Sequence, residues 1–268
     1  MRSLKKYEIH SSVIALAVCI ISAILHTVSM LFFCDADAYF TVGAAMPIVS
    51  NTFLAVSIIA FAVCAFLFTD SKSRVKAPEG VAGYFALLPA AALLIHSAQL
   101  VSTALASTSV LSIVKLMFAI VSAIFFIMIA FSKEYTTVTA LCGTGFIIWL
   151  GICWLNSYND LFIPMNSPEK LFFHFGCIGA ALLVVGELRS MYDISKPKLY
   201  RFSLWSAQLL LLAASLPSVI EFFTKSSKSS VFYESLVLFC IALYAIARSI
   251  SFMITSYRAK KEEAASEE

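Results

Sequence analysis

Ionisable side chains inside apolar segments are the groups in this sequence that could do chemistry. Lys115 is the one formal charge between Glu79 and Lys133, a stretch made mainly of apolar and small residues. A charge in the middle of a membrane helix costs about 2.5–3.5 kcal/mol on insertion scales, so it needs a partner or a route to water. Intramembrane charges of this kind mark solute pathways, ion pairs and proton relays, and Lys115 is therefore the first candidate for function.

Polar residues also concentrate in one half of the predicted membrane helices. In the eight-helix topology that the charges favour, nine side chains fall in the outer half or at the outer rim: His26, Asn51, His96, Gln99, Lys115, Asn156, His174, Glu221 and Glu234. All of these except Asn156 are taken as candidate binding residues. The one-sided concentration predicts a water-accessible cavity that opens outward and binds a small polar or charged solute. A chance drift of lipid-avoiding groups toward the rim would give the same pattern.

Two explanations compete for Lys115. In a helix the Cα–Cβ bond tilts toward the N-terminus, so this side chain is expected to lean outward. It lies about six residues below the preceding turn, roughly 9 Å along the axis, which is close enough for the amine to snorkel to the outer interface. The alternative is an ion pair. Glu221 is the preferred partner, and the alternatives are Glu234, Asp35 and Asp37.

Arg248 differs from Lys115 because its side chain leans away from the nearer, inner interface. Snorkelling is therefore disfavoured, and a buried partner is expected. Glu187 lies at a similar depth on the sixth apolar segment. The sequence predicts a contact between Glu187 and Arg248 that holds the sixth and eighth helices together, in a structural rather than a functional role.

Other chemistries find little support. His26, His96 and His174 lie on three different segments, and no segment carries two histidines at a spacing that suits haem. Lys115 lacks a clear carboxylate one turn away, as a retinal Schiff base would need. The chain has no His-Glu-x-x-His motif, no phosphate-binding glycine loop and no nucleic-acid-binding feature, and its seven cysteines are expected to be packing residues. We therefore expect no enzyme activity, no cofactor, no metal and no nucleic-acid partner.

The elements that position these residues follow from composition. Of the 268 residues, 60% are hydrophobic and 13% are charged, and the mean hydropathy is +0.90. Soluble domains average about 45–50% apolar and about 25% charged residues. The apolar runs reach about 20 residues or more without alternating, which is typical of spanning helices and not of a membrane barrel. The predicted fold is an all-α, polytopic transmembrane bundle embedded in the lipid bilayer.

Eight apolar segments are predicted to span the membrane as one transmembrane domain covering residues 1–268. Their approximate bounds are 11–33, 44–68, 81–103, 110–131, 137–156, 170–191, 202–223 and 231–257. The first is expected to remain as a helix rather than to be cleaved as a signal peptide. Residues 258–268 form a charged run without an apolar face, which is expected to be a disordered cytoplasmic tail.

The distribution of basic residues predicts the orientation. With both ends inside, the inner segments hold thirteen Lys and Arg residues, whereas the outer loops hold only Lys170, Lys225 and Lys228. The positive-inside rule then places both termini in the cytoplasm. The expected location is the plasma membrane. Pro89 and Pro217 are expected to bend the third and seventh helices beside His96 and Glu221.

Two function classes remain. The first is a small-solute transporter or permease-like binder with an outward-facing polar cavity. The second is an accessory, sensory or scaffold membrane subunit, in which stripes of small polar residues are seams between helices. The substrate and the oligomeric state are not specified by the sequence.

Overall fold

The computed structural model describes residues 7–34, 39–69, 75, 78, 80–107, 110–131, 136–160, 164, 167–192, 194, 196–225 and 232–265. Regular structure within these ranges is helical, apart from one isolated bridge between Cys34 and Phe40. Eight of the described helices are long and apolar enough to cross a membrane. The chain is thus a multi-pass helical membrane protein, as its composition predicts.

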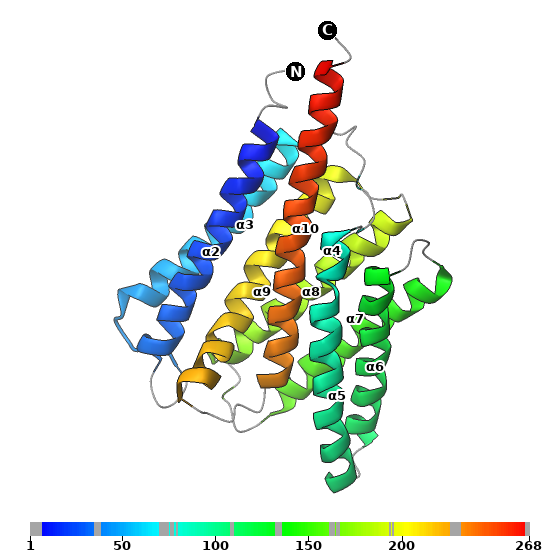
Figure 1. Ribbon diagram of the computed structural model, residues 1–268. Coiled ribbons are helices and arrows are strands. Elements are labelled where there is room, and N and C mark those ends of the chain that lie inside the picture. Colours follow the sequence, from blue (N-terminus) through cyan, green and yellow to red (C-terminus); the bar gives the residue numbers. More distant parts are fainter. Residues whose placement is uncertain are drawn as a thin grey trace.

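The helices follow the predicted order. They are α2 (Tyr7–Phe33), α3 (Ala45–Phe68), α4 (Val81–Tyr84), α5 (Leu87–Ser107), α6 (Val110–Phe131), α7 (Thr137–Asn159), α8 (Pro168–Met191), α9 (Pro197–Lys225) and α10 (Phe232–Ala265). The start of α2 and the end of α10 lie at the same end of the bundle, at the top of Figure 1. We call this the terminal end and the opposite one the far end.

Two predicted bounds need correction at the ends of α9 and α10. Helix α9 begins at Pro197, before the predicted start at residue 202, and α10 continues to Ala265. Residues 258–265 are therefore helical and do not form the expected disordered tail, while residues 266–268 lie outside the described part. The extension is explained by composition, because Lys, Glu and Ala are strong helix formers and can prolong a helix that is already nucleated.

The third predicted span is interrupted near its start. Helix α4 ends at Tyr84, and α5 begins at Leu87 with Pro89 in its first turn. Proline lacks an N–H to donate to Phe85, four residues earlier, and its ring clashes with that turn. Between the two helices, Ala86 N instead bonds Gly83 O at 2.9 Å, which closes a tighter turn. The chain thus starts a new helix at Leu87, with Pro89 in its first turn, where a bend within one helix was predicted.

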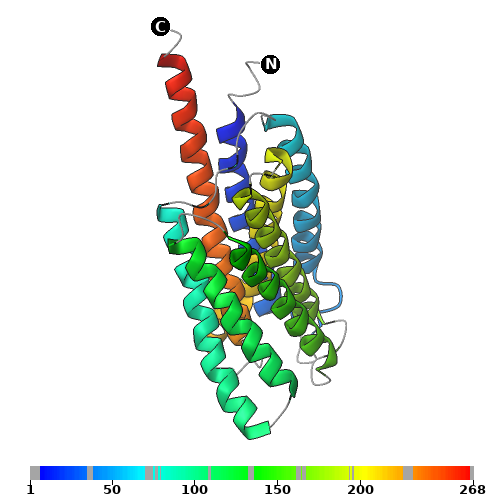
Figure 2. The same cartoon turned by 90° about the vertical axis from the view of Figure 1, so that its right-hand side faces the viewer.

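Helices α5 to α10 form a closed ring. Each of them packs against the next in sequence, and α10 packs against α5 to complete the circuit. Helices α2 and α3 lie outside this ring, where both contact α9. Figures 1 and 2 show α2 and α3 on one side of α9 and the α5–α6 pair on the other side of α10. The ring interior is the place where side chains from several helices meet.

Burial follows this arrangement. In the most apolar part of α9, 61% of the residues are buried, against 22% in α3. The interior toward the terminal end is filled by aromatic rings from three ring helices. Phe126 contacts Phe146 with ring centroids 5.3 Å apart, and it contacts Tyr244 at 6.2 Å. The interior is therefore a packed core and not an open pore at this level.

Glycines let α8 approach its neighbours closely. A Cβ atom added to Gly176 would lie 2.6 Å from the Cβ of Ala214 on α9 and 3.0 Å from Cδ1 of Leu238 on α10. On α7, a Cβ added to Gly151 would meet nothing within 4 Å. Small residues at such seams are the usual means of close helix contact in membranes.

We predict that Gly176→Ala destabilises the protein by about 1–3 kcal/mol, because the extra methyl overpacks the seam between α8, α9 and α10. Gly151→Ala is the matched control and is expected to be neutral or stabilising by about 0.5–1 kcal/mol. The measurement is the thermal unfolding midpoint of both purified variants. Equal midpoints would contradict the close packing at Gly176.

Candidate functional site

The ring interior holds a buried ion pair near the far end. Lys115 Nζ on α6 lies 2.5 Å from Glu234 Oε1 on α10, and the two side chains are 6% and 8% exposed. The prediction that Lys115 snorkels to the interface is therefore wrong. The prediction of Glu221 as its preferred partner is also wrong, whereas the alternative partner Glu234 is confirmed. Asp35 and Asp37 lie outside the described residues.

The orientation of α6 explains why Lys115 faces inward. Lys115, Ala119, Ser122 and Phe126 recur at helical spacing, and all four are buried. They form one stripe of α6 that faces the ring interior, while residues such as Met117 and Ile120 are exposed. The inward stripe places the amine opposite the first turn of α10, where Glu234 lies. The carboxylate offsets the cost of burying the charge.

His96 of α5 lies beside this pair. Its ring packs edge-on against Trp149 of α7 at 5.9 Å and stacks on Tyr233 of α10 at 6.2 Å. The imidazole interacts electrostatically with both Glu234 and Lys115. Among the described residues, neither ring nitrogen of His96 nor Oε2 of Glu234 has a hydrogen-bond partner. We call His96, Lys115 and Glu234 the ring cluster.

Two thiols border the ring cluster. Cys153 of α7 and Cys177 of α8 are both buried, and both interact electrostatically with Lys115. The cluster thus draws on α5, α6 and α10, and the bordering thiols add α7 and α8. It offers one cation, one anion and one imidazole with unused hydrogen-bonding groups. Such a set can hold a small dipolar solute or pass a proton.

The other predicted binding residues lie elsewhere. His26 on α2 lies 3.5 Å from Ser50 of α3 through Nδ1 and packs closely on Phe172 of α8. Gln99 donates to Thr103 one turn along its own helix, at 3.3 Å. His174 stacks on Trp154 at 5.2 Å. The remaining positions are exposed or half-buried: Asn51, Asn156 and Glu221. The structure brings His96, Lys115 and Glu234 together and does not join the others to them.

His26 instead lines a second, small pocket near the far end of α2. The pocket volume is about 10 Å³, the size of one water molecule. Its lining combines apolar residues with four polar ones, namely His26, Glu169, Ser218 and Ser235. Glu169 was not among the predicted site residues. It follows Pro168 at the start of α8, where an acidic residue is expected simply to favour the helix dipole.

The predicted contact between Glu187 and Arg248 is present. Arg248 Nε donates to both carboxylate oxygens of Glu187, at 3.0 and 3.2 Å, and both side chains are almost fully buried. The hydroxyl of Tyr200 donates to Glu187 Oε1 at 2.7 Å, and its ring lies 5.6 Å beneath the guanidinium. The network joins α8, α9 and α10 near the terminal end. Tyr200 had no sequence signal, because an aromatic residue at the start of a membrane helix is an ordinary interfacial anchor.

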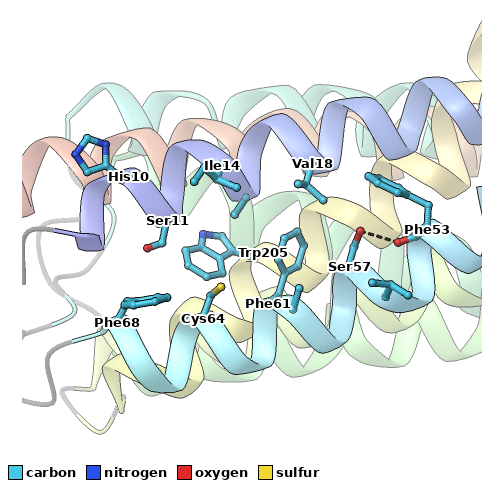
Figure 3. A pocket seen from close by; sticks show the side chains of 13 residues that line it. His10, Ser11, Ile14, Val18, Phe53, Ser57, Phe61, Cys64, Phe68 and Trp205 are labelled. Carbon is cyan, nitrogen blue, oxygen red and sulfur yellow. Dashed lines mark hydrogen bonds between the residues drawn. The ribbon is translucent and has the colours of Figure 1, made fainter. Parts of the chain in front are cut away.

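An apolar pocket opens between α2 and α3 (Figure 3). Its volume is about 360 Å³, and Trp205 of α9 lies between side chains of the two helices. The polar group that faces it from α3, Ser57, donates to Phe53 O of its own helix at 2.7 Å. The exposed neighbours Ile14 and Val56 are apolar, so this pocket suits hydrocarbon and not a polar solute.

Among the described residues, no group of three or more histidine, cysteine, aspartate or glutamate side chains converges to hold a metal ion. No family model, curated protein or solved structure matches the chain.

Proposed function

We propose that this protein is a small-solute transporter or permease-like binder of the plasma membrane, and that the ring cluster recognises its solute. The observation that carries the proposal is the Lys115–Glu234 pair, buried inside a closed ring of helices beside an imidazole with unused hydrogen-bonding groups. Ionisable groups inside a membrane bundle are costly, and they commonly mark substrate or proton pathways.

The chemistry of the cluster favours a zwitterionic solute. Lys115 can accept a carboxylate in place of Glu234, and Glu234 can accept an ammonium group in place of Lys115. Each half of the ion pair is then exchanged for a charge of the same sign on the solute, so neither buried group is left without a counterion. His96 and Oε2 of Glu234 provide further hydrogen-bonding capacity for the bound solute.

The cluster lies nearer the outer end of the bundle in the orientation that the basic residues favour. Lys115 lies about five residues after the start of α6, roughly 8 Å along the helix axis. Glu234 lies in the first turn of α10. Both helices begin at the far end, and the positive-inside rule assigns the terminal end to the cytoplasm. A solute would therefore reach the cluster from outside the cell.

An accessory, sensory or scaffold subunit is the second candidate. The Glu187–Arg248–Tyr200 network and the close glycine seam favour it, because both are rigid locks without an evident ligand. In that role the Lys115–Glu234 pair is a third lock. The two candidates differ in whether any solute competes with the pair.

A thermal-shift experiment tests the proposal. The purified protein is heated with alanine, with propionate or with ethylamine at equal ionic strength, and the set is then extended to larger amino acids. We expect at least one amino acid to raise the unfolding midpoint saturably, while the acid-only and amine-only analogues at the same concentration do not. Gln99→Leu, outside the cluster, should respond like the wild-type protein. The absence of any zwitterion response would count against the ring cluster as a solute site.

A further inference from the structure

We propose that the small pocket between α2, α8, α9 and α10 binds one monovalent cation of the size of sodium. The pocket lies near the far end and is lined by Glu169, Ala213, Pro217, Ser218 and Ser235, together with His26. This inference goes beyond the proposed function, because it requires neither transport nor a solute at the ring cluster.

Pro217 makes a backbone oxygen available at this pocket. It lies inside α9, and as a proline it has no N–H to donate to the carbonyl of Ala213, four residues earlier. Both residues line the pocket, so the interrupted side of the helix faces it. Backbone carbonyls at breaks in membrane helices are recurrent ligands of sodium in transporters.

The side chains complete an oxygen-rich donor set. Ser218 of α9 and Ser235 of α10 contribute hydroxyl oxygens, and Glu169 of α8 contributes a carboxylate. Hard cations prefer carboxylate, carbonyl and hydroxyl oxygen over nitrogen or sulfur. The volume of about 10 Å³ admits one small ion or one water molecule. A single carboxylate balances a single positive charge, which favours a monovalent ion.

The surrounding charges favour a cation as well. Glu169 interacts electrostatically with Glu221 and Asp160, and these two acids outnumber the one neighbouring base, Lys170. The amine of Lys170 donates to the backbone oxygen of Asp160. A cation bound at the pocket would therefore face more acidic than basic groups, and it would relieve the repulsion among the carboxylates.

His26 provides the second, independent sign of a ligand. The residue is fully buried and lines the pocket, and its Nε2 has no hydrogen-bond partner among the described residues. Its other nitrogen, Nδ1, lies 3.5 Å from Ser50 Oγ. With the proton on Nδ1, Nε2 is an acceptor. The lone pair of Nε2 can then face the bound cation directly, which satisfies a buried group that otherwise costs free energy.

The cation pocket and the ring cluster are connected by two consecutive residues of α10. Ser235 lines the cation pocket, and the preceding residue, Glu234, holds Lys115. Because these neighbours project from the same first turn of α10, a cation at Ser235 would fix the position from which Glu234 reaches Lys115. This adjacency gives the cation a direct route to influence the ion pair.

The test compares the unfolding midpoint of the purified full-length protein in sodium chloride and in N-methyl-D-glucamine chloride at equal ionic strength. We expect sodium to raise the midpoint saturably, by on the order of 5 °C near saturation. Ser218→Ala and Glu169→Gln should each weaken sodium binding, so that the half-saturating sodium concentration rises by about tenfold or more. Ser215→Ala is the matched control, because Ser215 lies on the same helix and bonds Leu211 O instead of lining the pocket.

Equal wild-type midpoints in the two salts would overturn the proposal, as would a wild-type sodium response in both pocket variants. If the variants do not fold, binding of radioactive sodium to the wild-type protein decides the matter. One displaceable sodium ion per chain supports the site, and none refutes it. These readouts need no transport assay, so failure here leaves the proposed solute function standing.

Discussion

Replacing Arg248 by leucine is expected to abolish the yield of folded protein, and replacing Glu187 by leucine should do the same. Each substitution leaves one charge buried without its partner, which costs about 3–5 kcal/mol. Replacing both residues by leucine should restore most of the yield, since a buried ion pair can often be exchanged for apolar residues at little cost. The measurement is the amount of monodisperse protein after size-exclusion chromatography, followed by its thermal midpoint.

Tyr200 sharpens this experiment. Its hydroxyl donates to Glu187, so in the double leucine variant the buried hydroxyl of Tyr200 loses that acceptor. Adding Tyr200→Phe should raise the midpoint of the double variant further, because an unsatisfied buried hydroxyl costs about 1–3 kcal/mol. Arg189→Leu serves as the control, since Arg189 is only half-buried and makes a long bond of 3.4 Å to Ile194 O. A double variant as poor as either single one would mean that the network has a role beyond mutual neutralisation.

The sequence predicts how deep each charged residue lies in the membrane, but not which helix carries its partner. For Arg248, helix direction and distance from the inner interface excluded snorkelling, and Glu187 lay at a matching depth. For Lys115, Glu221 and Glu234 lay at comparable depths near the same end. The choice between them depends on which helix faces α6 across the ring, and hydropathy carries no information about that neighbour order. Lys115 pairs with Glu234 because the face of α6 that carries Lys115 points into the ring interior, toward α10.

The spans were predictable because the bilayer fixes their length and hydropathy. Residues 110–131, for example, are helical as predicted. The errors lie where the bilayer no longer constrains the chain. Helix α10 continues past residue 257 on helix propensity alone, and Pro89 interrupts the third span near the interface. The predicted binding residues are not all neighbours, for another reason. Shared depth does not imply a shared azimuth, so His26 and His96 face different neighbours on different sides of the bundle.

The second large effect is expected at the ring cluster, where fold and function can be separated. Lys115→Met alone should lower the stability by about 3–5 kcal/mol, because it leaves Glu234 buried without its counterion. Adding Glu234→Met replaces the pair by two apolar side chains of similar length and should restore folding. The same double variant should lose the response of the unfolding midpoint to zwitterionic amino acids completely, since both charged groups that recognise the solute are gone.

The variant with leucine at positions 187 and 248 is the matched control for that result. It also replaces a buried ion pair, yet that pair lies toward the terminal end and holds helices together without touching the ring cluster. It should keep the solute response of the wild-type protein. His96→Phe should fold and weaken the response, because the ring stacking on Tyr233 is preserved while both nitrogens are lost. A zwitterion response that survives the double methionine substitution would place the binding site elsewhere, and equal loss in both double variants would show that the response reports general rigidity and not recognition by Lys115 and Glu234.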